Sequence, residues 1–251
     1  MKLKKLFLDT ETTGTTPNSA IVQIAGIMEV GGVEKEFDIN MRPHEGADIS
    51  PQALEIIGKT LEEINSYQSP EDAAVEFEKI LSEFVDPFKK GDKFTLYGHN
   101  IQFDFTKLME WYNRIGNKFL GSFIDFKFNF DTLQMMKNLQ LLEVVEYLEN
   151  NKLETCCDAF GIKLDGAHDA LNDIRATKKL YEHLEYIIKS KFDETYNRTL
   201  YPRMFERWTT EEERFLKVTE ETAQNAADRL GRTLQSVLRK AHRMDIKLKT
   251  K

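Results

Sequence analysis

The stretch that decides the fold of this chain is Leu6-Phe7-Leu8-Asp9-Thr10-Glu11-Thr12-Thr13-Gly14. Three apolar residues lead into two carboxylates that are one residue apart. Side chains two apart on a β-strand point to the same side, so we expect Asp9 and Glu11 to project together from the end of a buried strand. Two carboxylates this close repel each other unless a cation lies between them, and their hard oxygens suit Mg²⁺ or Mn²⁺. The alternative is an edge strand that runs into a solvated turn.

The composition is that of a soluble globular protein with a sizeable core, because 41% of its 251 residues are hydrophobic and 31% are charged. This length fits one large domain, or a domain of about 200 residues with an appendage. No apolar run reaches the roughly 18 residues of a membrane span, and the apolar run before Asp9 is too short for a signal peptide. The adjacent Cys156 and Cys157 are poorly placed to bridge each other, so we expect reduced thiols and a cytoplasmic protein.

The charge of the chain is unevenly distributed. Residues 1–202 carry 23 Lys and Arg against 34 Asp and Glu, a net charge of −11, whereas residues 203–251 carry 12 against 8, a net charge of +4. Such an asymmetry predicts two modules with different partners. The overall charge of −7 hides this difference.

The first part of the chain predicts an antiparallel sheet. The predicted strands are residues 3–8, 21–30 and 33–40. The second is apolar enough to be a buried central strand, and Gly31-Gly32 indicates the turn into the third. In the third strand, Val33, Phe37 and Ile39 alternate with charged residues that point outward.

Two helical patterns follow these strands. Ser50-Pro51 predicts a helix with proline at its first position. A longer pattern covers about residues 70–88, and its apolar face comprises Ala74, Phe77, Ile80, Leu81 and Phe84.

A short apolar strand at residues 94–97 runs directly into Gly98-His99-Asn100 and a second helix. Asp104 lies at this junction, from which its carboxylate can reach the metal site at the end of the first strand. The Asn100 amide can fix the turn or contact a ligand. The alternative is that Asn100 and Asp104 are only turn and capping residues.

Two further segments predict structure downstream. Asp131 and Gln134 have the spacing of a capping box, and Leu153 to Phe160 predicts a short helix closed by Gly161. His168 then opens a helix that continues to about Lys189, with Asp173 and Thr177 on one face. A histidine at a helix start is commonly a cap, but this one lies five residues before a carboxylate that can face the same site.

These motifs together resemble the DEDDh 3′→5′ exonucleases, a family that includes the proofreading subunit of bacterial replicative polymerases and ribonuclease T. The resemblance rests on Phe-Leu-Asp-Thr-Glu-Thr-Thr-Gly, on His-Asn-x-x-Phe-Asp and on His-x-x-x-x-Asp, and it covers roughly residues 3–190. It implies an α/β, ribonuclease H-like fold, with a mixed five-stranded sheet flanked by helices. It also implies a two-metal hydrolysis with Mg²⁺ or Mn²⁺ that releases nucleoside 5′-monophosphates. The implied metal ligands are Asp9, Glu11, Asp104 and Asp173, with His168 as general base.

The resemblance implies further contacts with substrate. The candidate residues are Thr10, Thr12, Thr13, Ile24, Asn100 and Phe103. Packing in the core is an equally good explanation for residues of these types. The nuclease part is acidic and has no dense basic strip, so its own hold on DNA is expected to be weak.

The C-terminal segment predicts a small three-helix module at residues 205–251, separate from a nuclease domain at residues 1–200. Thr209 and Glu212 form a capping box, a second helix covers about residues 222–230, and a third begins after Gly231 with an apolar stripe that includes Leu238. Trp-Thr-x-Glu-Glu and Leu-Gly-Arg-Thr-x-x-Ser-Val resemble a Myb/SANT-like helix-turn-helix. That resemblance implies a third helix that enters the DNA major groove, with the candidate DNA-binding residues Arg232, Gln235, Arg239, Lys240 and Arg243. The alternative is a protein-docking module with a solvated basic face.

Together these observations predict a metal-dependent 3′→5′ DNA exonuclease with a DNA-binding appendage, in replication or repair. Its expected partners are single-stranded DNA ends at the active site and duplex DNA at the C-terminal module, with a polymerase as a further candidate. Two alternatives remain. One is an exoribonuclease that trims RNA 3′ ends, and the other is a non-catalytic DNA-binding or polymerase-docking protein on a nuclease fold.

Overall fold

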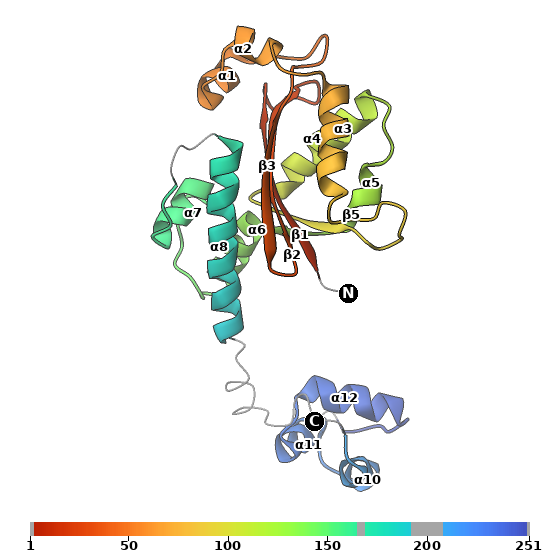
Figure 1. Cartoon of the computed structure of the whole chain (residues 1–251). Coiled ribbons are helices and arrows are strands. Elements are labelled where there is room, and N and C mark those ends of the chain that lie inside the picture. Colours follow the sequence, from red (N-terminus) through yellow and green to blue (C-terminus); the bar gives the residue numbers. More distant parts are fainter. Residues whose placement is uncertain (1–2, 165–168, 192–207, 250–251) are drawn as a thin grey trace. The chain divides into compact units, whose positions relative to one another are not determined.

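The computed structural model describes residues 3–164, 169–191 and 208–249 (Figure 1). Its strands are β1 (Lys4–Thr12), β2 (Ile21–Val30), β3 (Val33–Asn40), β4 (Phe94–Gly98) and β5 (Ile124–Asp131). The helices that accompany them are α1 (Pro51–Ile57), α2 (Leu61–Asn65), α3 (Pro70–Leu81), α4 (Ile101–Arg114), α5 (Leu120–Phe123), α6 (Thr132–Leu141), α7 (Leu153–Ala159) and α8 (Ala170–Lys191). The C-terminal helices are α10 (Thr210–Val218), α11 (Ala223–Leu230) and α12 (Leu234–Arg243).

The strands form one mixed sheet in the order β3-β2-β1-β4-β5. β2 pairs antiparallel with both of its neighbours, whereas β4 is parallel to β1 and β5 is parallel to β4. The predicted five-stranded mixed sheet with flanking helices is therefore confirmed. β1 is the central strand, and it pairs with β4 from Lys5 to Phe7 and with β2 along its whole length, so its last residues are held by β2 alone.

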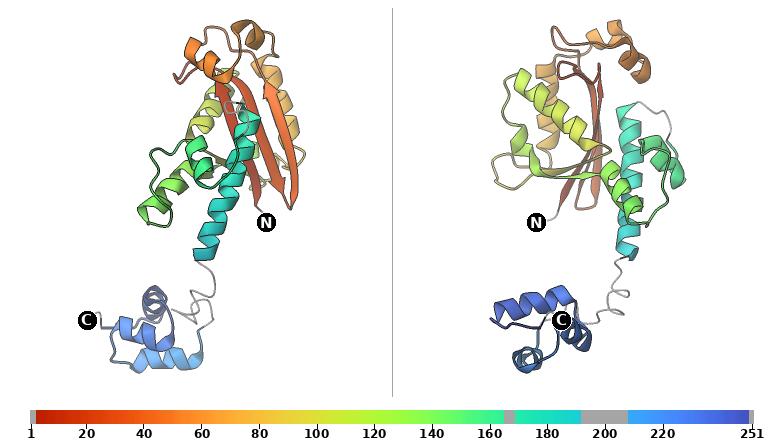
Figure 2. Two further views of the ribbon diagram at one scale, coloured as in Figure 1. Left: turned by 90° about the vertical axis from the view of Figure 1, so that its left-hand side faces the viewer. Right: turned by 180° about the vertical axis from the view of Figure 1, so that it is seen from behind.

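Helices cover both faces of the sheet (Figures 1 and 2). Leu6 and Leu8 of β1 belong to the large core with α3 and α4, and Phe7 packs on the opposite face against Ile174 and Tyr181 of α8. Odd-numbered residues of β1 therefore face α8. This alternation decides on which side the carboxylates of β1 emerge.

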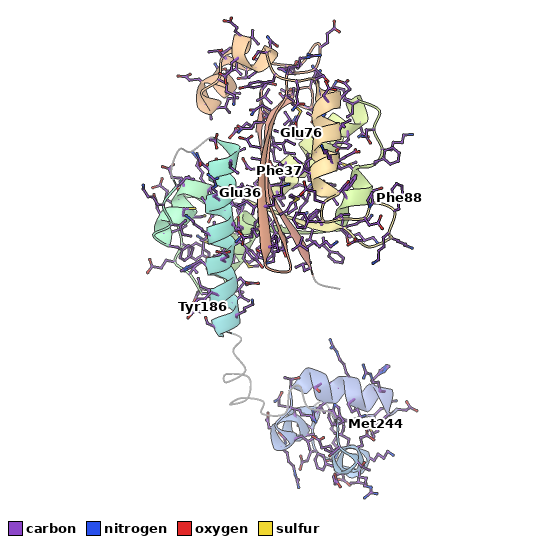
Figure 3. The ribbon with its side chains drawn as sticks, in the orientation of Figure 1. Glu36, Phe37, Glu76, Phe88, Tyr186 and Met244 are labelled. Atoms are coloured by element: carbon purple, nitrogen blue, oxygen red, sulfur yellow. The ribbon has the colours of Figure 1, made fainter. Side chains whose placement is uncertain are left out.

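Two neighbouring residues of strand β3, Glu36 and Phe37, likewise point to opposite faces of the sheet (Figure 3). Phe37 packs against Phe77 of α3, with 5.6 Å between the ring centroids. Glu36 accepts hydrogen bonds from the guanidinium of Arg175 on α8, at 2.9 and 2.5 Å. The apolar contact and the ion pair fix α3 and α8 on opposite sides of the sheet.

Several element boundaries differ from the prediction. The first strand does not end at residue 8 but continues to Thr12, because β2 pairs with it as far as Ile21. The helix predicted over residues 70–88 ends at Leu81, and hydrogen-bonded turns continue only to Val85. Pro87 lacks an amide donor and disfavours helix at Asp86, so the helix could not have reached residue 88. Val33, at the turn between β2 and β3, is 58% exposed and does not face the core.

Helix caps follow the sequence closely. The Ser50 side chain accepts from the Ala53 amide, and Asp131 accepts from the first amides of α6. Gly161, with φ of 65°, follows the end of α7 as predicted. The second half of the predicted capping box is wrong, because the Gln134 side chain donates to Asn138 instead of reaching back.

The chain divides into two compact units, Met1–Leu184 and Glu185–Lys251. The boundary predicted between residues 200 and 205 stays a prediction, since residues 192–207 lie outside the described part. Cys156 and Cys157 are buried free thiols, as expected.

The C-terminal helices surround a small core of their own. Leu216, Ala226, Ala227 and Val237 are its buried members. The predicted capping box of Thr209 and Glu212 is present at the start of α10. Leu238 was predicted on the apolar stripe, but it is 36% exposed, because only part of the α12 surface faces the other two helices.

Candidate metal and nuclease site

Two carboxylates project from the central strand toward α8. Asp9 lies opposite Ala25 and Glu11 lies opposite Gln23 in the antiparallel pair with β2. They lie within the last four residues of β1, at the strand end from which they were expected to project, and hydrogen bonding to β2 orders their backbone. Both side chains are half-buried and share the face of Phe7.

A third carboxylate comes from α8. The Asp173 side chain reaches the other two, and one oxygen from each of Asp9, Glu11 and Asp173 lies within 4.8 Å of the others. Ile174, the next residue along the helix, is fully buried against the sheet. Packing of α8 therefore brings together residues that are more than 160 positions apart.

Asp104 joins the site from the first turn of α4. Its Oδ1 accepts from the Thr10 amide at 2.9 Å and from the Thr10 hydroxyl at 2.7 Å. The carboxylate is only 3% exposed. Thr10, predicted to contact substrate, has a different role: it ties Asp104 to the central strand between Asp9 and Glu11.

The carboxylates raise one another's pKa. Burial raises the pKa of Asp9 well above its usual range, and the charges of Asp104 and Glu11 add to this effect. Burial, followed by the charges of Asp173 and Asp104, raises the pKa of Glu11 to about 7. Burial also raises the pKa of Asp104 to about 7, although its hydrogen bonds from Thr10 oppose the shift. Without a cation, the deprotonated cluster is therefore unfavourable.

The donor set fits a hard divalent cation. All the converging ligands are carboxylate oxygens, which Mg²⁺ and Mn²⁺ prefer over the nitrogen and sulfur ligands of zinc or copper sites. Asp9, Glu11 and Asp173 would hold such an ion directly, with Asp104 beside them. The predicted general base, His168, lies outside the described residues.

The turn that leads into α4 is held by the start of α6. Asn100 adopts a left-handed conformation, with φ of 64° and ψ of 37°. Its backbone N–H donates to Asp131 Oδ1 at 2.9 Å. His99 contacts the Thr132 hydroxyl and the Asn151 carbonyl. The Asn100 side chain is exposed and makes no capping bond, so it can contact a ligand.

The other candidate substrate contacts differ in burial, and only those that are partly exposed can reach a substrate. Ile24 is fully buried in the main core, so its prediction as a substrate contact is wrong. Thr13 is fully buried as well, and its hydroxyl donates to the Asp48 carbonyl and accepts from the Ala20 amide. Thr12 and Phe103 are half-buried and remain candidates, with the Thr12 hydroxyl bonded to the Gly14 carbonyl.

A cleft begins where β1 ends. It has a volume of about 520 Å³, and its lining includes Gly14, Ser50, Ala53 and Ile56. Ile56 is 56% exposed, so the cleft offers an apolar wall.

Sequence reasoning missed two charged residues near the carboxylates. Asp169 raises the pKa of both Asp9 and Glu11, and Lys59 lowers that of Glu11. Asp169 could have been found from its place one helical turn before Asp173. Lys59 lies in the stretch of residues 50–60, which also resembles the exonuclease family, but no local pattern gives it a role, because its contact with Asn40 joins the segment between α1 and α2 to β3.

The candidate DNA-binding residues of the C-terminal module differ in exposure. The prediction for Arg232 is wrong: its side chain is fully buried, and it donates to Glu212 at 2.7 and 3.0 Å. Lys240 is half-buried and paired with Glu213. Arg239 and Arg243 are exposed, and the Gln235 side chain lies outside the described part of the structure.

No helix in the described ranges combines the length and hydropathy needed to cross a membrane. Residues 6–181 match the model of the family described as Exonuclease, which is divalent-metal dependent. The DNA polymerase III PolC-type protein of Thermotoga maritima is 27% identical over 177 residues, which are 69% of this chain and 11% of that protein.

Solved structures share the fold. A crystal structure of E. coli Exonuclease I in complex with a dT13 oligonucleotide aligns with a TM-score of 0.63 and 22% identity, over 78% of this chain and 44% of that one. The structure of cell-death related nuclease 4 aligns with a TM-score of 0.59 and 14% identity, over 73% and 64% of the respective chains. This likeness shows the ribonuclease H-like exonuclease fold. The chain thus spans a ninth of the polymerase and less than half of Exonuclease I.

Proposed function

The chain belongs to the Exonuclease family, and from this premise we propose that it is a divalent-metal-dependent 3′→5′ exonuclease acting on DNA. The observation that carries the proposal is the convergence of Asp9, Glu11, Asp104 and Asp173 from β1, α4 and α8. Their mutual repulsion makes cation binding favourable. When bound, divalent ions promote ionisation of the attacking water and stabilise the charge on the departing oxygen.

The residues of the chain supply the remaining steps. His168, as a neutral imidazole, takes a proton from the attacking water, which suits a group with a pKa near the working pH. Thr10 holds Asp104 in place through its amide and hydroxyl. The scissile phosphodiester lies against the carboxylate cluster, and the terminal nucleoside is released as its 5′-monophosphate.

The cleft beyond β1 is the proposed pocket for the terminal nucleoside. Its volume of about 520 Å³ is in the range of small-molecule sites. Ile56 offers an apolar surface for a base, and Thr12 lies at the strand end that borders the pocket. Phe103, on the same turn as Asp104, is a second proposed contact.

DNA is the proposed substrate because of the relatives. One is named a DNA polymerase III, and Exonuclease I is described in complex with a deoxythymidine oligonucleotide. The same names support a proposed role in DNA replication or repair, beside a polymerase. Matched DNA and RNA oligonucleotides in direct competition test this choice: we expect faster nucleotide release from DNA, and a preference for RNA would make the protein an exoribonuclease.

The C-terminal module is proposed to be a Myb/SANT-like unit that binds duplex DNA. Arg239 and Arg243 are exposed on α12, four residues apart and therefore on one face. The buried pair of Arg232 and Glu212 links the turn before that helix to α10. If the module instead docks a protein, it alone will retain that protein and will not bind duplex.

Substitution of His168 tests the proposed mechanism. His168→Ala should lower kcat by roughly 10²–10⁴-fold and leave metal binding largely intact. The rate of the unaltered protein should rise with pH as the imidazole loses its proton. A His168→Ala protein within a few-fold of full activity would make this residue a helix cap.

A further inference from the structure

A row of polar residues crosses the face of the sheet that carries the carboxylates. Glu11 on β1 lies opposite Gln23 on β2, and Gln23 lies opposite Asn40 on β3. Directly paired residues share a face, and neighbouring strands are about 4.8 Å apart. Asn40 is therefore on the same face as Glu11 and about 10 Å from it along the row.

Lys59 occupies the far end of this row. Its Nζ donates to Asn40 Oδ1 at 3.3 Å and to the Tyr67 hydroxyl at 3.2 Å, and it lies 5.3 Å from the centre of the Tyr67 ring. The backbone around Lys59 is well defined: Gly58 ends α1, the Lys59 amide donates to the Leu54 carbonyl, and Thr60 caps α2. The ammonium is thus held at the edge of the acidic site.

The charge of Lys59 is only weakly neutralised. Within the described residues its nearest carboxylate is Glu63, at 4.0 Å, which is beyond hydrogen-bond distance. Glu63 already accepts from the Tyr67 hydroxyl at 2.5 Å. The hydrogen-bond partners of Lys59 are neutral oxygens, and the Lys59 side chain is 15% exposed.

We propose that Lys59 binds a phosphate group of the substrate strand on the β3 side of the carboxylate cluster. A nucleic acid that approaches Asp9, Glu11 and Asp173 meets strong negative charge, and a partly exposed ammonium beside them offsets it. The phosphate is either an internal phosphodiester or a terminal 3′-phosphate. This inference rests on the proposed nuclease function.

The test compares Lys59→Gln with the full chain on 5′-labelled single-stranded DNA. Loss of a phosphate contact should raise KM about tenfold, leave kcat within about threefold, and flatten the salt dependence of KM by roughly 0.7. Lys79→Gln, at an exposed lysine on α3, is the matched control and should behave like the original protein. Unchanged KM and salt slope in Lys59→Gln would overturn the proposal.

A second variant separates charge from packing. Lys59→Arg keeps the charge, so its KM should stay within about threefold of the original. A rise as large as that of Lys59→Gln would assign the effect to the packing of α1 and α2 and overturn the proposal.

The substrates identify the phosphate. A strand that ends in a 3′-hydroxyl lacks the terminal phosphate of a strand that ends in a 3′-phosphate. A methylphosphonate near the 3′ end removes the charge of one internal phosphodiester. Comparison of these strands therefore tests each candidate phosphate separately. The modification that weakens binding to the original protein should have no effect on Lys59→Gln. Equal effects on both proteins would contradict the contact. If the original protein releases no nucleotide at all, the nuclease function itself fails, and this proposal fails with it.

Discussion

At the scale of single residues, the site depends on carboxylates whose pKa values are raised. Glu11 and Asp104 have pKa values of about 7, against usual values of 4.5 and 3.8. A group with a raised pKa in the folded state contributes stability below its unfolded pKa and loses that contribution as the pH rises through the folded value. The metal-free protein should therefore lose stability between about pH 4.5 and pH 7, and divalent cations should restore it above pH 7.

Asp9→Asn tests this electrostatic account. In EDTA at pH 8 the variant should melt at a higher temperature than the original protein, by roughly 2–4 °C for each kcal/mol of repulsion removed. It should lose turnover and most of the rise in Tm on addition of Mg²⁺. Glu55→Gln, at an exposed carboxylate on α1, is the control and should change neither property. A metal-free Tm that is constant from pH 5 to pH 8 would be evidence against the cluster.

At the scale of elements, local signals predicted the first four strands, most of the caps and the order of the site motifs, but they did not locate β5 (Ile124–Asp131). The alternation of Asp9 and Glu11, the start of α1 at Pro51 and the glycine after α7 all follow from residues close in sequence. What could not be predicted depends on distant pairing. The end of β1 follows from its register with β2, and the burial of Arg232 follows from Glu212, twenty residues earlier. The sequence around Arg232, next to the start of α12, does not indicate that it pairs with a distant glutamate.

The buried pair of Arg232 and Glu212 should determine whether the C-terminal module folds. Arg232→Met leaves the Glu212 carboxylate buried without this partner, which costs about 3–5 kcal/mol in such pairs. Amide hydrogen exchange in α10, α11 and α12 should then accelerate at least about 100-fold. Arg239→Met, at an exposed arginine of the same module, is the control. Equal exchange rates in the two variants would show that the pair is dispensable.

At the scale of the whole molecule, two units of opposite charge are joined in one chain. The nuclease part carries −11 up to residue 202, and the remaining segment carries +4. The acidic part should attract DNA only weakly, whereas the basic module, in its proposed role as a duplex-binding unit, should raise the local concentration of DNA near the site. Affinity for duplex and chemistry at the strand end should therefore be separable.

A chain that ends at Arg203 tests this separation. It should degrade short single strands at close to the original rate and bind long duplex more weakly. Each lost phosphate contact contributes about 0.9 to the salt slope, so the loss of Arg239 and Arg243 should flatten it by about 2. The double variant R239Q/R243Q in the full chain should show a similar change. Equal affinity and equal slope in all three proteins would contradict duplex binding by the module.

The measurement that tests the central claim most directly is the time course of digestion of a 5′-labelled single-stranded DNA. With Mg²⁺ present, the label should move through products that shorten by one nucleotide at a time from the 3′ end, and free nucleoside 5′-monophosphates should accumulate. EDTA and Asp173→Asn should each stop the reaction. Immediate release of the label as a mononucleotide, cuts at internal positions, or full activity in EDTA would contradict a metal-dependent 3′→5′ exonuclease.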